Sequence, residues 1–132
     1  MTPHSGIVLF AHGSRDPLWR RPMEAVRDHL QAAQPALDVR CAYLELCDPS
    51  LPATVADMAA RGITHIGIVP MFLGTGRHAR EDLPRMVQEL AQAHAHLQIG
   101  LRPPIGEDGR MIALMAQIAG EALESTEKRV TG

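Results

Sequence analysis

Short apolar runs alternate along the chain with longer segments in which apolar residues recur every three or four positions. A short apolar run bounded by turn residues is typical of a buried strand, and the longer spacing is typical of one buried helical face. The predicted strands are residues 6–10, 39–44, 66–72 and 97–101, and the predicted helices are residues 17–34, 51–61, 82–95 and 109–123. Strands alternating with helices predict an α/β fold with a parallel four-stranded sheet covered on both sides by helices.

Several polar and turn-forming residues mark the ends of the predicted helices. Gly62 follows the second helix, where glycine is a common stop signal. Asp82 is predicted to cap the third helix, which puts Pro84 in the first turn, where its missing N–H group is harmless. Asp108 is predicted to cap the last helix. The inner face of the first helix is predicted to contain Met23, Val26, Leu30 and Ala33.

The composition fits one globular domain over residues 1–132. Hydrophobic residues make up 45% and charged residues 21%, which argues against a disordered chain. Aromatic residues make up only 3%, so single-stranded nucleic acid, whose bases stack on aromatic rings, is not a predicted partner. The net charge of −2 gives no overall basic field that would attract polyanions.

Nothing in the sequence predicts contact with a membrane. No apolar run reaches the roughly 18 residues of a membrane-spanning helix, and the N-terminus lacks the basic and apolar segments of a secretory signal. We therefore expect a cytoplasmic protein. Cys41 and Cys47 are too few for a disulfide framework and do not form a C-x-x-C pair, so two reduced thiols are expected.

Three potential metal ligands follow three of the predicted strands. His12 comes after the first strand, Glu45 after the second and His78 after the third. The carboxyl ends of parallel strands share one edge of the sheet, where ligands bind, so these side chains are expected to meet there. Imidazole suits Co²⁺, Ni²⁺, Fe²⁺ and Zn²⁺, and a carboxylate adds charge without the tight grip of a thiolate. Taken singly, each residue is more commonly a solvated surface residue.

Arginines and a glycine-rich stretch flank the two histidines. Arginine side chains and the closely approachable backbone of a glycine-rich loop would suit a carboxylate-rich ligand. The candidate binding residues are Ser14, Arg15, Gly74, Thr75, Gly76, Arg77 and Arg80. The alternative is that the arginines form ordinary surface ion pairs with Asp16, Glu81 or Asp82. The loop has neither the P-loop ending nor G-x-G-x-x-G spacing, so no nucleotide is expected.

Several motifs, in order along the chain, resemble those of the sirohydrochlorin chelatases, also called class II chelatases. They are HGSRDP (12–17), YLEL (43–46), PSL (49–51), VPMFLG (69–74), HAREDLP (78–84) and RPPIG (102–106). The resemblance covers essentially the whole chain. One departure is Arg77, where many relatives carry a glycine; it adds a carboxylate contact or narrows the loop.

The resemblance implies an activity as well as a fold. Such enzymes insert Co²⁺, or in relatives Fe²⁺ or Ni²⁺, into sirohydrochlorin, a tetrapyrrole on the routes to cobalamin and siroheme. It implies a three-layer, flavodoxin-like chelatase fold, with His12 and His78 as the catalytic, metal-handling pair and Glu45 as an acidic participant. A chain of this length resembles the short, single-domain type, which works as a homodimer with tetrapyrrole sites between subunits.

Two other function classes stay open at this point. The same site would serve a non-catalytic protein that binds and delivers a tetrapyrrole or a divalent metal. Histidine phosphatases also carry a His-Gly pair after their first strand, but they place an arginine directly before that histidine. Ala11 occupies this position here, which disfavours phosphoryl transfer through His12.

Overall fold

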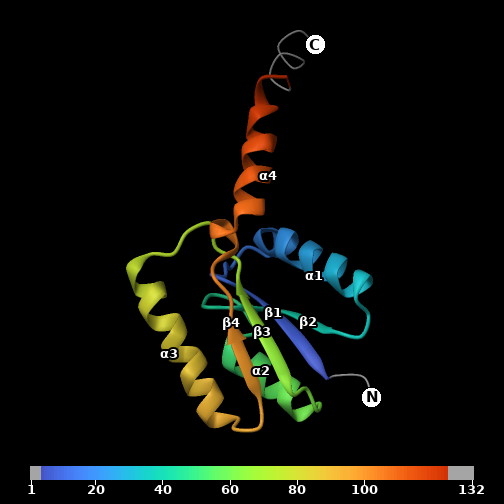
Figure 1. The fold of residues 1–132 in the computed structure, drawn as a ribbon, viewed down its shortest axis with the longest axis vertical. Helices are drawn as coiled ribbons and strands as arrows, with labels where there is room; N and C mark the ends of the chain where they lie inside the picture. Colours follow the sequence, from blue (N-terminus) through green and yellow to red (C-terminus); the bar gives the residue numbers. More distant parts are fainter. Residues whose placement is uncertain (1–3, 125–132) are drawn as a thin grey trace.

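The four predicted strands form one parallel sheet in the computed structural model, which describes residues 4–124 (Figure 1). The strands are β1 (Ser5–Ala11), β2 (Asp38–Tyr43), β3 (His65–Pro70) and β4 (Gln98–Leu101), paired in the order β2-β1-β3-β4. The helices are α1 (Arg21–Ala33), α2 (Leu51–Ala60), α3 (Arg77–Ala93) and α4 (Gly109–Gly120), with short 3-10 turns η1 (Pro17–Arg20) and η2 (Ile105–Glu107). The predicted α/β fold class is confirmed.

The core consists of two clusters on opposite faces of the sheet. One face packs against α2 and α3 through residues such as Val8, Ile68 and Leu90. The other face packs against α1 through Leu9 and Cys41, with Met23 and Leu30 contributed by the helix. No helix among residues 4–124 is long and apolar enough to span a membrane.

The first and second helices follow the sequence prediction with one correction. Gly62 has a φ of 91°, as expected of a glycine after a helix. In α1, Met23 and Leu30 pack on the sheet, but Val26 is 41% exposed and Ala33 is exposed as well. The predicted inner face is therefore only half correct. The reason is that α1 lies mainly over the edge strand β2, so part of its apolar face has no strand beneath it.

The third helix begins earlier than the sequence predicted. Gly76 is its N-cap and Arg77 its first residue, so the prediction that Asp82 caps this helix is wrong. Pro84 consequently lies inside α3 rather than in its first turn. An interior proline lacks one helical N–H donor, and the adjacent Leu83 is buried in the core at this point of the helix.

The last helix also differs in position. Asp108 caps α4 as predicted, its side chain accepting a hydrogen bond from the amide of Arg110. However, α4 extends away from the sheet instead of covering it (Figure 1). Within residues 4–124, one half of the sheet face next to α1 is therefore without a helix, so the expected coverage of the sheet on both sides is incomplete there.

Candidate functional site

His12 and Glu45 are joined through their backbones at the carboxyl edge of the sheet. His12 directly follows β1, and Glu45 lies shortly after β2. The amide of Leu44 donates to the carbonyl of Ala11, and the amide of Glu45 donates to the carbonyl of His12, both at 2.9 Å. These bonds continue the β1–β2 ladder past the ends of the strands. The predicted meeting of the His12 and Glu45 segments at one edge therefore occurs.

Gly13 makes this close approach possible. Its φ is 103°, a left-handed backbone conformation that residues other than glycine rarely adopt. A Cβ atom at this position would lie 1.8 Å from the carbonyl oxygen of Glu45. On the other side of the contact, Leu46 also has a positive φ, of 69°, which turns the chain directly after Glu45. The loop geometry thus depends on the glycine that follows His12.

His78 reaches the same edge from the first turn of α3. The amide of Arg80 donates to the carbonyl of Gly76 at 3.1 Å and closes the first helical turn around it. Amide N–H groups in a first helical turn have no carbonyl partner within the helix and attract anionic groups. His78 therefore sits at a helix N-terminus and not in the free loop that the sequence suggested.

One pocket of about 380 Å³ brings the three candidate ligands together. Its lining includes His12 from the β1 edge, Glu45 from the β2 edge and His78 from α3. The remaining lining residues are Phe10, Leu44, Phe72, Gly76, Arg77, Ala79, Asp82, Leu83 and Met86. Most of these are apolar, so the pocket combines an apolar wall with a few polar groups, as small-molecule sites usually do.

Phe72 lines the pocket, although the sequence placed it in a strand and in the VPMFLG motif without a role in the site. Its ring stacks on the imidazole of His12, with centroids 4.3 Å apart and planes 28° apart. Phe72 is itself buried and contacts Phe10, at a centroid distance of 6.1 Å. The scarcity of aromatic residues in this chain, and the position of Phe72 after the third strand, are the signals that would have found it.

The candidate binding residues divide into three groups. Gly76 and Arg77 line the pocket with the histidines, and Arg77 also contacts Glu81 at 3.3 Å, as the ion-pair alternative predicted. Thr75 and Arg80 line an adjoining hollow beside Pro104. Ser14, Arg15 and Gly74 line neither cavity, and the Ser14 hydroxyl instead accepts a hydrogen bond from the amide of Asp16.

The three candidate ligands line one pocket but do not form a compact metal site. Within residues 4–124, no three histidine, cysteine or acidic side chains are close enough together to hold an ion. His12, Glu45 and His78 thus border one pocket without forming a closed set of ligands. The thiol of Cys41 packs in the cluster on the α1 face of the sheet, and burial raises its pKa. Desolvation likewise raises the pKa of the buried Tyr43 to about 12.

The chain matches a known protein family. The CbiX family matches residues 6–122, nearly the whole of the described chain. The chain belongs to the CbiX family. The sirohydrochlorin cobaltochelatase of Methanopyrus kandleri is 33% identical to this CbiX family member over 81 residues. That match covers 61% of this chain and 57% of the relative, so the chain spans little more than half of that protein.

Solved structures agree with the assignment to the CbiX family. A putative cobalamin biosynthesis CbiX protein from Marinobacter aquaeolei superposes with a TM-score of 0.81 and 33% identity, covering 92% of this chain and 98% of that one. The cobalt complex of the sirohydrochlorin chelatase SirB from Bacillus subtilis subspecies spizizenii superposes with a TM-score of 0.69 and 29% identity. That match covers 79% of this chain and 44% of SirB.

Proposed function

We propose that this CbiX family member is a sirohydrochlorin chelatase that inserts a divalent metal, Co²⁺ first, into the tetrapyrrole. The observation that carries the proposal is the convergence of His12, Glu45 and His78 on one largely apolar pocket. The relatives named as sirohydrochlorin cobaltochelatase and sirohydrochlorin chelatase supply the substrate class. Fe²⁺ and Ni²⁺ are further candidate metals, because ligand type separates these ions poorly.

The pocket suits a flat, carboxylate-rich macrocycle. Phe72, Leu44 and Met86 offer apolar surface to one edge of the ring system. Arg77, at the mouth of the pocket, and the free amides of the first turn of α3 supply positive charge for the carboxylates. We assign the same role to Arg80 and Thr75 in the adjoining hollow, and to Ser14, Arg15 and Gly74 in the flanking loops.

Metal insertion requires two steps, delivery of the metal and removal of protons, and we assign both to the histidines. The pyrrole N–H protons must leave as the metal arrives, and the metal must be held weakly enough to be passed on. A neutral imidazole can bind the ion or accept a proton near pH 7. We assign His12 and His78 to present the metal and accept protons, and Glu45 to orient them or relay protons to solvent. Because the three side chains are exposed at the pocket, one side of the metal stays open to the macrocycle.

The proposal includes a cytoplasmic homodimer of single-domain chains over residues 1–132. The lengths of the matched proteins support it: the chain covers 98% of the Marinobacter protein but only 44% of SirB. A relative of twice the length can hold two such units in one chain, and the short form then needs a second copy.

The deciding experiment is metallation in the absence of oxygen. Purified protein is mixed with sirohydrochlorin and Co²⁺, and the visible spectrum is followed and corrected for the uncatalysed rate. We expect catalysed insertion, which falls about a hundredfold or more in His12→Ala and in His78→Ala. His29→Ala, on the exposed surface of α1, is the matched control. Full activity in both site variants would refute the assigned roles. A tetrapyrrole that binds without turnover would instead identify a delivery protein.

A further inference from the structure

The segment between β3 and α3, residues 71–76, is rich in glycine. A Cβ atom added at Gly74 or at Gly76 would meet no atom of the described chain within 4 Å, so neither position is confined by its surroundings. Leu73 is 70% exposed and does not anchor the segment through its side chain. A glycine-rich segment samples many backbone conformations unless other contacts hold it. The contacts that hold this one must therefore come from elsewhere in the chain.

The proposed metal insertion requires this segment to stay in one position. It contains Phe72, whose ring stacks on the imidazole of His12 at a centroid distance of 4.3 Å. It ends at Gly76, the N-cap of the helix that carries His78 as its second residue. A displacement of the segment would therefore move both candidate metal-handling side chains. A misplacement of about 1 Å is enough to cost an enzyme about a hundredfold in rate.

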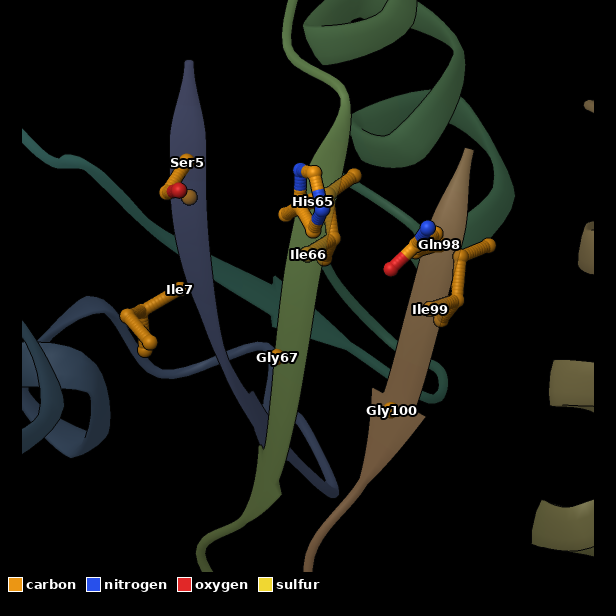
Figure 2. A pocket seen from close by; sticks show the side chains of 9 residues that line it. Ser5, Ile7, His65, Ile66, Gly67, Gln98, Ile99 and Gly100 are labelled. Carbon is orange, nitrogen blue, oxygen red and sulfur yellow. The ribbon is translucent and has the colours of Figure 1, made fainter. Parts of the chain in front are cut away.

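The chain that follows β4 lies against this segment. β3 and β4 run side by side in the same direction, so the segments that follow them leave the sheet at the same edge (Figure 2). The chain after β4 begins with the motif RPPIG (102–106), and none of its residues is among those that line the pocket of the histidines. Its two prolines restrict the backbone, because each ring fixes its φ. The amide of Arg102 donates to the carbonyl of Ile68 at 2.9 Å, which ties the start of the motif to β3.

Gly106, the last residue of this motif, is packed directly on the backbone of the glycine-rich segment. Its amide donates to the carbonyl of Phe72 at 2.9 Å. A Cβ atom at Gly106 would lie 2.0 Å from the carbonyl oxygen of Leu73, so a larger residue fits only if that backbone moves. The hydroxyl of Thr75 donates to the carboxylate of Glu107 at 3.4 Å. Gly106 and Glu107 both belong to the turn η2, which therefore holds the segment near each of its ends.

We propose that the turn η2 positions the two histidines for metal insertion. Gly106 positions His12 through the backbone of Phe72, and Glu107 positions His78 through the residue before the N-cap of α3. The inference rests on the proposed function and adds two positioning residues to it. Gly106 does not line the pocket, so it acts only through the segment that it holds. A hydrogen bond to the carbonyl of Phe72 suits this role, because fixing the backbone fixes the direction in which the ring points.

The first test is an NMR measurement that needs neither metal nor tetrapyrrole. The ring current of Phe72 shifts the ring protons of the stacked His12, and His12→Ala identifies that signal among the seven histidines. In Gly106→Ala the His12 signal is expected to move toward its position in Phe72→Leu. Gly109→Ala is the matched control and keeps the signal in place, because a Cβ there meets no described atom within 4 Å. An unchanged His12 signal in folded Gly106→Ala would overturn the proposal.

The second test is the rate of metallation. Gly106→Ala should lower kcat about tenfold, as Phe72→Leu is expected to do, with KM for sirohydrochlorin changed less than about twofold. Because both changes act on His12 through the same ring, the double variant should be no slower than Phe72→Leu alone. Independent defects would multiply instead. A multiplied loss, or normal turnover in Gly106→Ala, would contradict positioning through Phe72.

Variants of Glu107 test the same turn without disturbing its close packing, and so decide the proposal even if Gly106→Ala does not fold. Glu107 is exposed; Glu107→Leu removes the acceptor, and Glu107→Gln keeps one. We expect Glu107→Leu to lower kcat about two- to threefold and Glu107→Gln to restore it. Equal rates in the two variants would exclude the hydrogen bond as a positioning contact. The His12 signal is measured without turnover, so a failure of positioning and a failure of the chelatase assignment can be told apart.

Discussion

The imidazole of His12 stacks on the ring of Phe72, with ring centroids 4.3 Å apart. Phe72 is only 4% exposed and also contacts Phe10, so its ring is held in place by the core. A fixed ring restricts the rotamers of the imidazole that stacks on it. Phe72 is therefore a positioning residue for His12 under the proposed function.

Replacing Phe72 by leucine is expected to reduce metallation in a way that its loss of stability alone does not explain. The change keeps an apolar side chain, so the loss in unfolding free energy should be about 1–2 kcal/mol. We expect kcat to fall about tenfold because the imidazole is less well oriented. Leu90→Val, elsewhere in the same core cluster, should cause a similar loss of stability with normal turnover. Urea unfolding and initial rates measure both; equal turnover in the two variants would contradict a positioning role.

The charge of Glu45 is expected to matter separately from its shape. Glu45→Gln preserves the size of the side chain and its backbone bond to His12. If the carboxylate relays protons or orients the histidines, kcat should fall about a hundredfold and the unfolding midpoint should stay unchanged. Glu89→Gln, on the exposed surface of α3, removes the same charge outside the pocket. A Glu45→Gln enzyme as fast as this control would remove Glu45 from the mechanism.

Gly13→Ala is expected to damage the site through the backbone. The new Cβ would collide with the carbonyl oxygen of Glu45 at 1.8 Å, and the φ of 103° disfavours alanine. We expect a loss of at least about 1–3 kcal/mol in unfolding free energy, together with a strong loss of metallation. Gly74→Ala is the control, because a Cβ there meets nothing within 4 Å. Comparable thermal midpoints for both variants would refute the close-packed loop.

One ion-pair cluster predicts how stability depends on pH. The guanidinium groups of Arg40 and Arg61 hold the pKa of the Asp57 carboxyl below its usual range. Such a carboxylate adds stability above its unfolded pKa of about 4, and this contribution is lost as the pH falls through the folded pKa. Asp57→Asn should therefore lower the Tm at neutral pH.

The pH series itself provides the check on Asp57. The difference in Tm between wild type and Asp57→Asn should shrink as the pH is lowered below about 4. Glu89→Gln, on the exposed surface of α3, is the control for removing one surface charge. Thermal melts followed by circular dichroism measure the difference, and a gap that is constant with pH would exclude the ion pairs as its cause.

The sequence by itself determined the strands, their parallel sheet and the edge at which His12, Glu45 and His78 gather. These follow from local periodicity and from the rule that parallel strands end at one edge. It also predicted Gly62 as a helix stop and Asp108 as a cap, because both depend on the residues directly around them.

Only the tertiary structure decided the features that depend on contacts between distant segments. Local capping preference pointed to Asp82, but α3 starts at Arg77 with Gly76 as its N-cap. The helix residues that pack in the core, such as Leu83 and Leu90, lie in its later turns and do not mark where it begins. The stacking of Phe72 on His12 joins two strand ends that lie far apart in sequence. The projection of α4 was also beyond local patterns: its apolar residues predicted burial, but Ile112 and Ile118 are more than half exposed in the described chain.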